Sequence, residues 1–107
     1  MTRFRDEDLL QVLACDPEQR PPAPGADALA RFVTAAWASP DTLVLAIDEA
    51  GRDVAEAFVA AEQVCCAGIG WQLESAPQLR LRITASGPQL KVLSGLVPPG
   101  INIEEVQ

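Results

Sequence analysis

The cysteines are the residues of this chain with the clearest chemical potential. The 107 residues include three cysteines and no histidine, and two of the cysteines, Cys65 and Cys66, are neighbours. A metal site would therefore have to be built from thiolates and carboxylates, and a catalytic dyad would lack imidazole, the usual base near neutral pH. The composition favours either thiolate chemistry or no chemistry, so we expect a binding protein rather than an enzyme.

A helix predicted over residues 52–66 gives the two neighbouring cysteines different surroundings. Cys65 continues the apolar stripe that contains Phe58, which predicts a small buried core residue. Cys66 lies one turn beyond Glu62, and a thiol and a carboxylate four residues apart on a helix can share one ion. We therefore expect Cys66 and Glu62 to act together at the end of this helix.

The position of these thiols at a helix C-terminus restricts their chemistry. The helix macrodipole is negative there and disfavours a thiolate, so a bare cysteine nucleophile would be better placed at the opposite end. A bound cation reverses this effect, because coordination deprotonates the thiol. The helix end therefore favours a thiolate bound to a soft metal over an activated nucleophile.

Cys15 is the third candidate thiolate. It follows a short predicted helix and precedes a proline-rich loop that could fold back over the rest of the domain. Three thiolates without imidazole suit copper(I), mercury(II), arsenic(III), or zinc with a fourth ligand from a carboxylate or water. The predicted metal site is therefore Cys15, Cys65, Cys66 and Glu62, without another cofactor. The chain has no Cys-x-x-Cys pair, so three unrelated thiols are the alternative.

Charge and composition argue against several classes of function. Eight basic and fifteen acidic residues give a net charge of −7, which repels nucleic-acid phosphates and anionic lipids. No apolar run is long enough to span a bilayer, and Met1–Asp8 has no apolar signal core. We therefore expect a cytoplasmic protein that binds neither nucleic acid nor membrane. The sequence leaves open a homodimer or another protein partner.

The rest of the sequence predicts one α+β domain over residues 1–107. Hydrophobic residues make up 49% and charged residues 21%, which is typical of a globular chain. We divide the domain into an N-terminal helix and Pro-rich linker (1–25), a core (26–97) and a tail (98–107). In the core, alternation predicts strands at 71–74 and 79–84, a short β-branched run predicts one at 42–47, and the match between the two halves favours one at 32–37. Helical periodicity predicts helices at 52–66 and 86–97. Residues 28–33 also fit a helix, and residues 101–106 fit either a frayed tail or an edge strand.

The two halves of the core repeat each other. Leu43–Ile47, followed by Gly51, is matched about 36 residues later by Leu79–Ile83, followed by Gly87. We therefore predict a strand–strand–helix unit that occurs twice and forms a two-layer domain of sheet and helices.

The predicted elements also assign the larger side chains. We expect Trp37 and Trp71 to anchor the core from their hairpins. Arg80 and Arg82 are expected on the solvent face of a strand, where they offset the acidic surface or form a small anion site. The residues expected to be buried are Leu43, Leu45, Ile47, Phe58, Trp71, Leu79, Leu81, Ile83, Leu90 and Leu93.

From Trp37 to Val97 the chain resembles a group of small, poorly characterised actinobacterial proteins, some of which are encoded near mercury-type regulator genes. Their pattern includes a helix that ends in E-x-x-C-C-P-F, and this chain has the sequence Glu62-Gln-Val-Cys-Cys-Ala-Gly68 there. Ala67 and Gly68 thus replace the Pro-Phe of that group. An upstream Ala-Cys in the group is similar to Ala14-Cys15. The resemblance implies that these cysteines form one site.

The doubled strand–strand–helix unit also resembles the architecture shared by organomercurial lyase and a copper-binding accessory lipoprotein. The lyase uses a lone cysteine, a nearby acid and a Cys-Cys dipeptide. By this resemblance, Cys15 with Asp16 or Glu18 corresponds to the first pair, and Cys65-Cys66 to the dipeptide. We therefore predict binding of a soft metal or metalloid. Cysteine-based carbon–mercury chemistry is the enzymatic alternative, and a dimerisation or interaction module with inert cysteines is the third.

Overall fold

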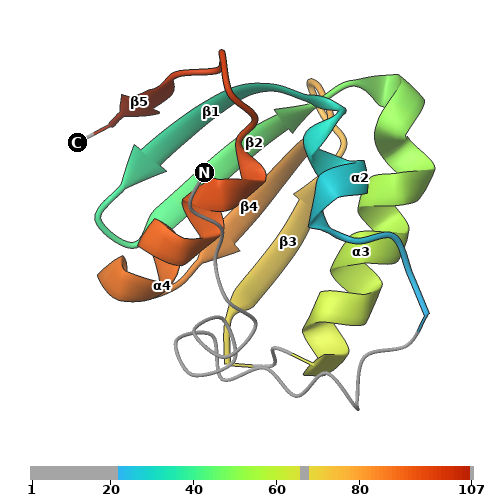
Figure 1. Cartoon of the computed structure of the whole chain (residues 1–107), viewed down its shortest axis with the longest axis horizontal. Coiled ribbons are helices and arrows are strands. Elements are labelled where there is room, and N and C mark those ends of the chain that lie inside the picture. The colour runs from blue at the N-terminus through green and yellow to red at the C-terminus, as the bar shows by residue number, and fades with distance from the viewer. Residues whose placement is uncertain (1–21, 66–67, 107) are drawn as a thin grey trace.

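The computed structural model describes residues 22–65 and 68–106 (Figure 1). The predicted N-terminal helix, Cys15 and Cys66 lie outside these residues. The described chain forms a five-stranded sheet with helices, which confirms the predicted α+β class. Its elements are α2 (Ala26–Ala30), β1 (Val33–Ser39), β2 (Thr42–Ile47), the short 3-10 helix η2 (Glu49–Gly51), α3 (Arg52–Cys65), β3 (Gly70–Glu74), β4 (Arg80–Thr84), α4 (Gly87–Leu93), the 3-10 helix η3 (Ser94–Leu96) and β5 (Ile103–Glu105).

The strand order in the sheet is β3-β4-β2-β1-β5. The neighbouring strands run antiparallel except β1 and β5, which are parallel. The tail therefore contains an edge strand, with Ile103 opposite Ala36, and this resolves the two alternatives for residues 101–106. The acidic Glu104 and Glu105 occupy that strand, and charged residues on a short edge strand discourage further strand pairing.

The central strands β2 and β4 pair in the register that a two-fold repeat requires. Leu45 lies opposite Leu81, and these residues are 36 positions apart, the offset found in the sequence. Leu43 lies opposite Ile83 on the same side of the sheet. The two units, β1-β2-α3 and β3-β4-α4, are therefore related by a local two-fold rotation about the Leu45–Leu81 pair.

The helices cover one face of the sheet (Figure 1), and the hydrophobic core lies between the two layers. Leu45 and Leu81 at the centre have no exposed surface, and no polar side chain is buried among the described residues. Every residue expected to be buried is buried in the structure, namely Leu43, Leu45, Ile47, Phe58, Trp71, Leu79, Leu81, Ile83, Leu90 and Leu93.

Short polar motifs begin the helical segments. The side chain of Asp48 accepts a hydrogen bond from the backbone N–H of Ala50, at the start of η2. Ser86 and Gln89 form a reciprocal capping box at the start of α4, where each side chain accepts from the backbone N–H of the other residue. These contacts satisfy backbone donors that a helix end leaves without a partner, so the boundaries follow from the sequence.

Trp37 does not lie in the core, and that prediction was wrong. It lies opposite Val44, on the sheet face away from the helices, whereas the equivalent residue of the second unit, Leu73, lies opposite Leu81 and packs against the core. The two hairpins therefore pair with registers that differ by one residue. A shift of one residue turns a strand's side chains to the other face of the sheet.

Candidate functional site

The described part of the predicted metal site is a thiol–carboxylate pair in the last turn of α3. Cys65 is the last residue of this helix, and Glu62 lies three residues earlier on the same face. The Cys65 Sγ donates a hydrogen bond to the Glu62 Oε2 at 3.1 Å. Cys65 is 6% exposed, as its place on the apolar stripe predicted, and Glu62 is half-buried. The Cys65 thiol thus contacts the apolar core on one side and the Glu62 carboxylate on the other.

The spacing of this pair is close to that of two ligands on one ion. In a tetrahedral site with a metal–sulfur bond of about 2.3 Å and a metal–oxygen bond of about 2.0 Å, the two ligand atoms are about 3.5 Å apart. The two atoms here are 3.1 Å apart, so an adjustment of about 0.4 Å would let both bind one ion. The thiol would lose its proton on binding, and the hydrogen bond would be replaced by two metal–ligand bonds.

The other two predicted ligands, Cys15 and Cys66, lie outside the described residues, and the expected contact between Cys66 and Glu62 stays a prediction. Within residues 22–65 and 68–106, no group of three or more His, Cys, Asp or Glu side chains is placed to hold a metal ion. The described chain therefore supplies one sulfur and one oxygen, and a complete site needs thiolates from the remaining cysteines.

The end of α3 is fixed to the neighbouring strand by side chains next to the pair. The Gln63 Nε2 donates a hydrogen bond to the backbone carbonyl of Trp71 in β3 at 3.1 Å. One turn earlier, the rings of Phe58 and Trp71 meet edge to face, with centroids 5.9 Å apart and planes at 79°. These contacts hold the last two turns of the helix against β3, and so position Cys65 and Glu62.

A second group of candidate side chains lies on the open face of the sheet, and the sequence identified it only in part. The Arg80 guanidinium carbon lies 5.2 Å from the centroid of the Trp37 ring, which is a cation–π contact. The neighbouring Arg82 Nε is 3.3 Å from the Glu74 Oε2. The Arg-x-Arg alternation indicated the solvent face, but the orientation of Trp37 depends on the hairpin register, which the composition of the strand does not reveal.

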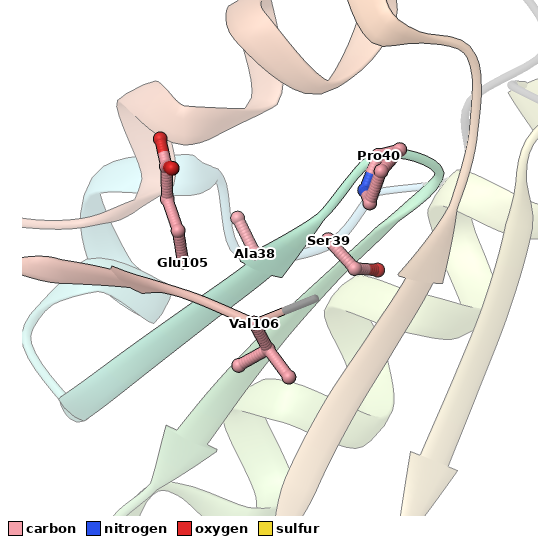
Figure 2. Close-up of a pocket in the computed structure, with 5 residues that line it drawn as sticks. All are labelled: Ala38, Ser39, Pro40, Glu105 and Val106. Atoms are coloured by element: carbon pink, nitrogen blue, oxygen red, sulfur yellow. The ribbon is translucent and has the colours of Figure 1, made fainter.

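A pocket lies at the end of β1 (Figure 2). Its volume is about 310 Å³, and its lining residues are Ala38, Ser39, Pro40, Glu105 and Val106. Among the described residues, Glu105 is the one charged residue in this lining, and neither Glu62 nor Cys65 contributes to it. The pocket is therefore separate from the two predicted ligands that the structure describes, Glu62 and Cys65.

No helix in the described part of the chain is both long and apolar enough to cross a membrane. The resemblance to actinobacterial proteins with a Glu-x-x-Cys-Cys element stays a prediction based on that motif. The chain was compared with known proteins, and no protein-family model, no curated protein and no solved structure matches it.

Proposed function

We propose that this protein binds one soft metal ion at the C-terminal end of α3. The ligands are Cys65 and Glu62, together with the thiolates of Cys66 and Cys15. The observation that supports this proposal is the 3.1 Å contact between the Cys65 Sγ and the Glu62 Oε2, which brings a sulfur and an oxygen ligand together. Three thiolates and no imidazole favour copper(I), mercury(II), arsenic(III) or zinc.

The electrostatics of this position favour a cation. The C-terminus of α3 carries the negative end of the helix dipole, Glu62 adds a carboxylate, and the whole chain has a net charge of −7. Each thiol must lose its proton to bind the ion, so binding releases protons and should weaken as the pH falls. The ion would stabilise thiolates that the helix end otherwise disfavours.

The proposal can be tested by titrating the reduced protein with zinc or copper(I) against a competing chelator. We expect one ion per chain and, for copper(I), absorption from sulfur-to-metal charge transfer. Cys66→Ser and Cys15→Ser should each lower the affinity at least about tenfold, which corresponds to about 1.4 kcal/mol per lost ligand. Circular dichroism should show that these variants remain folded.

Cys65→Ser tests the described half of the site most closely. The serine hydroxyl can still donate a hydrogen bond to Glu62, so the variant removes the sulfur and keeps the contact. The matched control is Val64→Ser in the same turn, where the side chain is 53% exposed and has no proposed role. We expect a loss of affinity in the first variant only. Equal affinities of the wild type and a variant with all three cysteines replaced by serine would refute the proposal.

A further inference from the structure

The open face of the sheet has a regular order of side chains from one strand to the next. Along one row, successive in-register partners are Arg82 on β4, Val44 on β2, Trp37 on β1 and Glu104 on β5. From β4 to β5 the row therefore runs from a cation through an aliphatic and an aromatic side chain to an anion, and on β3 the uncharged Gln72 lies beyond Arg82. If a second copy presents the same row in the opposite order, each cation faces an anion and each aliphatic side chain faces an aromatic one.

The centre of this face is made of small and apolar side chains. Next to the Val44–Trp37 pair lie Ala46 and Ala35, which also face each other across β2 and β1. Ala46 is 1% exposed although it lies outside the hydrophobic core, since it sits on the face that Arg80 crosses to reach Trp37. Ala46 is thus covered within the chain, and the apolar surface that a partner can reach at this centre belongs to the half-buried Ala35, Trp37 and Val44.

The charged side chains at the two sides of this centre have free capacity for a partner. Arg80 has the cation–π contact but no hydrogen bond or ion pair with the described residues, and its Nε is buried without a hydrogen-bond partner. Glu104 is exposed and makes no ion pair within the described chain. Arg82 uses its Nε for Glu74, and a guanidinium has further donors for a second carboxylate.

We propose that this open face associates with the same face of a second copy of the chain. The two-fold axis runs parallel to the strands, between β1 and β2. Rotation about this axis leaves each residue at the same height along the strands but reverses the order of the strands. Val44 therefore faces the second copy's Trp37, and Arg82 faces the second copy's Glu104. The interface then has Val44 and Trp37 at its centre, with the Arg80 guanidinium against the Trp37 ring, and an ion pair on each side, which is an isologous contact.

The size of the face predicts a weak dimer. Four strands about 4.8 Å apart and about five residues long present on the order of 300 to 500 Å² per copy. Stable complexes bury about 800 Å² per partner, so this contact is at the low end of specific interfaces. The dimer should therefore dissociate on dilution in the micromolar range, and it does not depend on the proposed metal site.

Charge reversal on the two sides of the face tests the proposal. Arg82→Glu alone and Glu104→Arg alone each place like charges opposite each other in the homodimer, and should weaken association at least about tenfold. An equimolar mixture of the two variants restores an attractive pair on both sides, so the mixture should form the dimer. Arg31→Glu, which makes the same charge change at an exposed residue after α2, is the matched control.

The measurement is sedimentation velocity from about 5 µM to about 500 µM, in buffer with a metal chelator so that no ion can bridge two chains. We expect a concentration-dependent dimer for the wild type and for Arg31→Glu, monomers for each single variant, and a dimer for their mixture. A wild type that is monomeric throughout this range would overturn the proposal. A wild-type dimer that both single variants keep unchanged would overturn it equally.

Discussion

The first strand–strand–helix unit, β1-β2-α3, and the second, β3-β4-α4, place their inner strands at equivalent positions but differ in their helices. Leu45 and Leu81 occupy the same place in the two units and lie opposite each other. In contrast, α3 has 14 residues and α4 has seven. The additional turns of α3 contain both Glu62 and Cys65. These two candidate metal ligands therefore lie in a part of the first unit that the second unit lacks.

The outer strands of the two units differ as well. Trp37 and Leu73 are equivalent in sequence, but the first points to the open face and the second packs against the core. The proposed dimer contact thus also depends on a position, Trp37, at which the first unit differs from the second. In this molecule the shared positions build the scaffold, and the positions that differ between the units carry the candidate functions.

The two tryptophans provide the prediction with the largest expected effect. Trp71 is 7% exposed and packs against Phe58, so Trp71→Ala should lower the free energy of unfolding by about 3–5 kcal/mol. Trp37→Ala removes a half-buried ring and its cation–π contact, and should cost about 1 kcal/mol. Urea denaturation at low protein concentration measures both values. Equal losses would contradict the assignment of the two rings to different faces.

Gly51 and Gly87 occupy equivalent positions and should respond differently to alanine. A Cβ on Gly51 would lie 2.3 Å from the Phe32 Cγ and 2.5 Å from its Cβ, so Gly51→Ala should cost about 1–3 kcal/mol. A Cβ on Gly87 would meet no atom within 4 Å, and Gly87→Ala should be neutral or stabilise by about 0.5 kcal/mol. Thermal unfolding of the two variants compares them directly. A stable Gly51→Ala variant would show that Phe32 does not pack there.

The capping box predicts a moderate effect in the second unit. Ser86→Ala removes the hydroxyl that accepts from the backbone N–H of Gln89, and should cost about 1 kcal/mol. Ser94→Ala is the control, because this hydroxyl donates to the carbonyl of Lys91 and caps no free N–H. We expect a change below about 0.5 kcal/mol in the control, measured by urea denaturation. A similar loss in both variants would contradict the role assigned to Ser86.

The smallest expected effect concerns the pH dependence of stability and the ion pair between Glu49 and Arg52 at the start of α3. A hydrogen bond from the Arg52 guanidinium, helped by its charge, lowers the pKa of Glu49 below its ordinary value. The ion pair therefore stabilises the folded state at pH values above the ordinary pKa of a glutamate. This stabilisation is lost as the pH falls through the lowered pKa of Glu49. NMR titration of the Glu49 carboxyl should show this shift, and Arg52→Gln should abolish it. An unchanged titration in that variant would remove Arg52 as the cause.

The sequence predicted the inner strands and the buried residues well because local patterns determine them. The short β-branched run Thr42–Ile47 predicts the bounds of β2, and the apolar stripe of α3 predicts the burial of Cys65. The face of Trp37 could not be predicted, because it depends on a hairpin register that is set by contacts between strands. The contact between Glu62 and Cys65 was also missed, since neighbours three and four residues apart are both possible on a helix.

X-ray absorption at the zinc edge, on protein loaded with one equivalent of zinc, most directly tests the soft-metal site. The proposal predicts sulfur ligands at about 2.3 Å together with one oxygen ligand at about 2.0–2.2 Å. It also predicts that Cys65→Ser lowers the number of sulfur ligands by one, whereas Val64→Ser leaves the spectrum unchanged. A spectrum with oxygen ligands alone, or a sulfur count that does not change in Cys65→Ser, would contradict the assignment of Cys65 as a metal ligand.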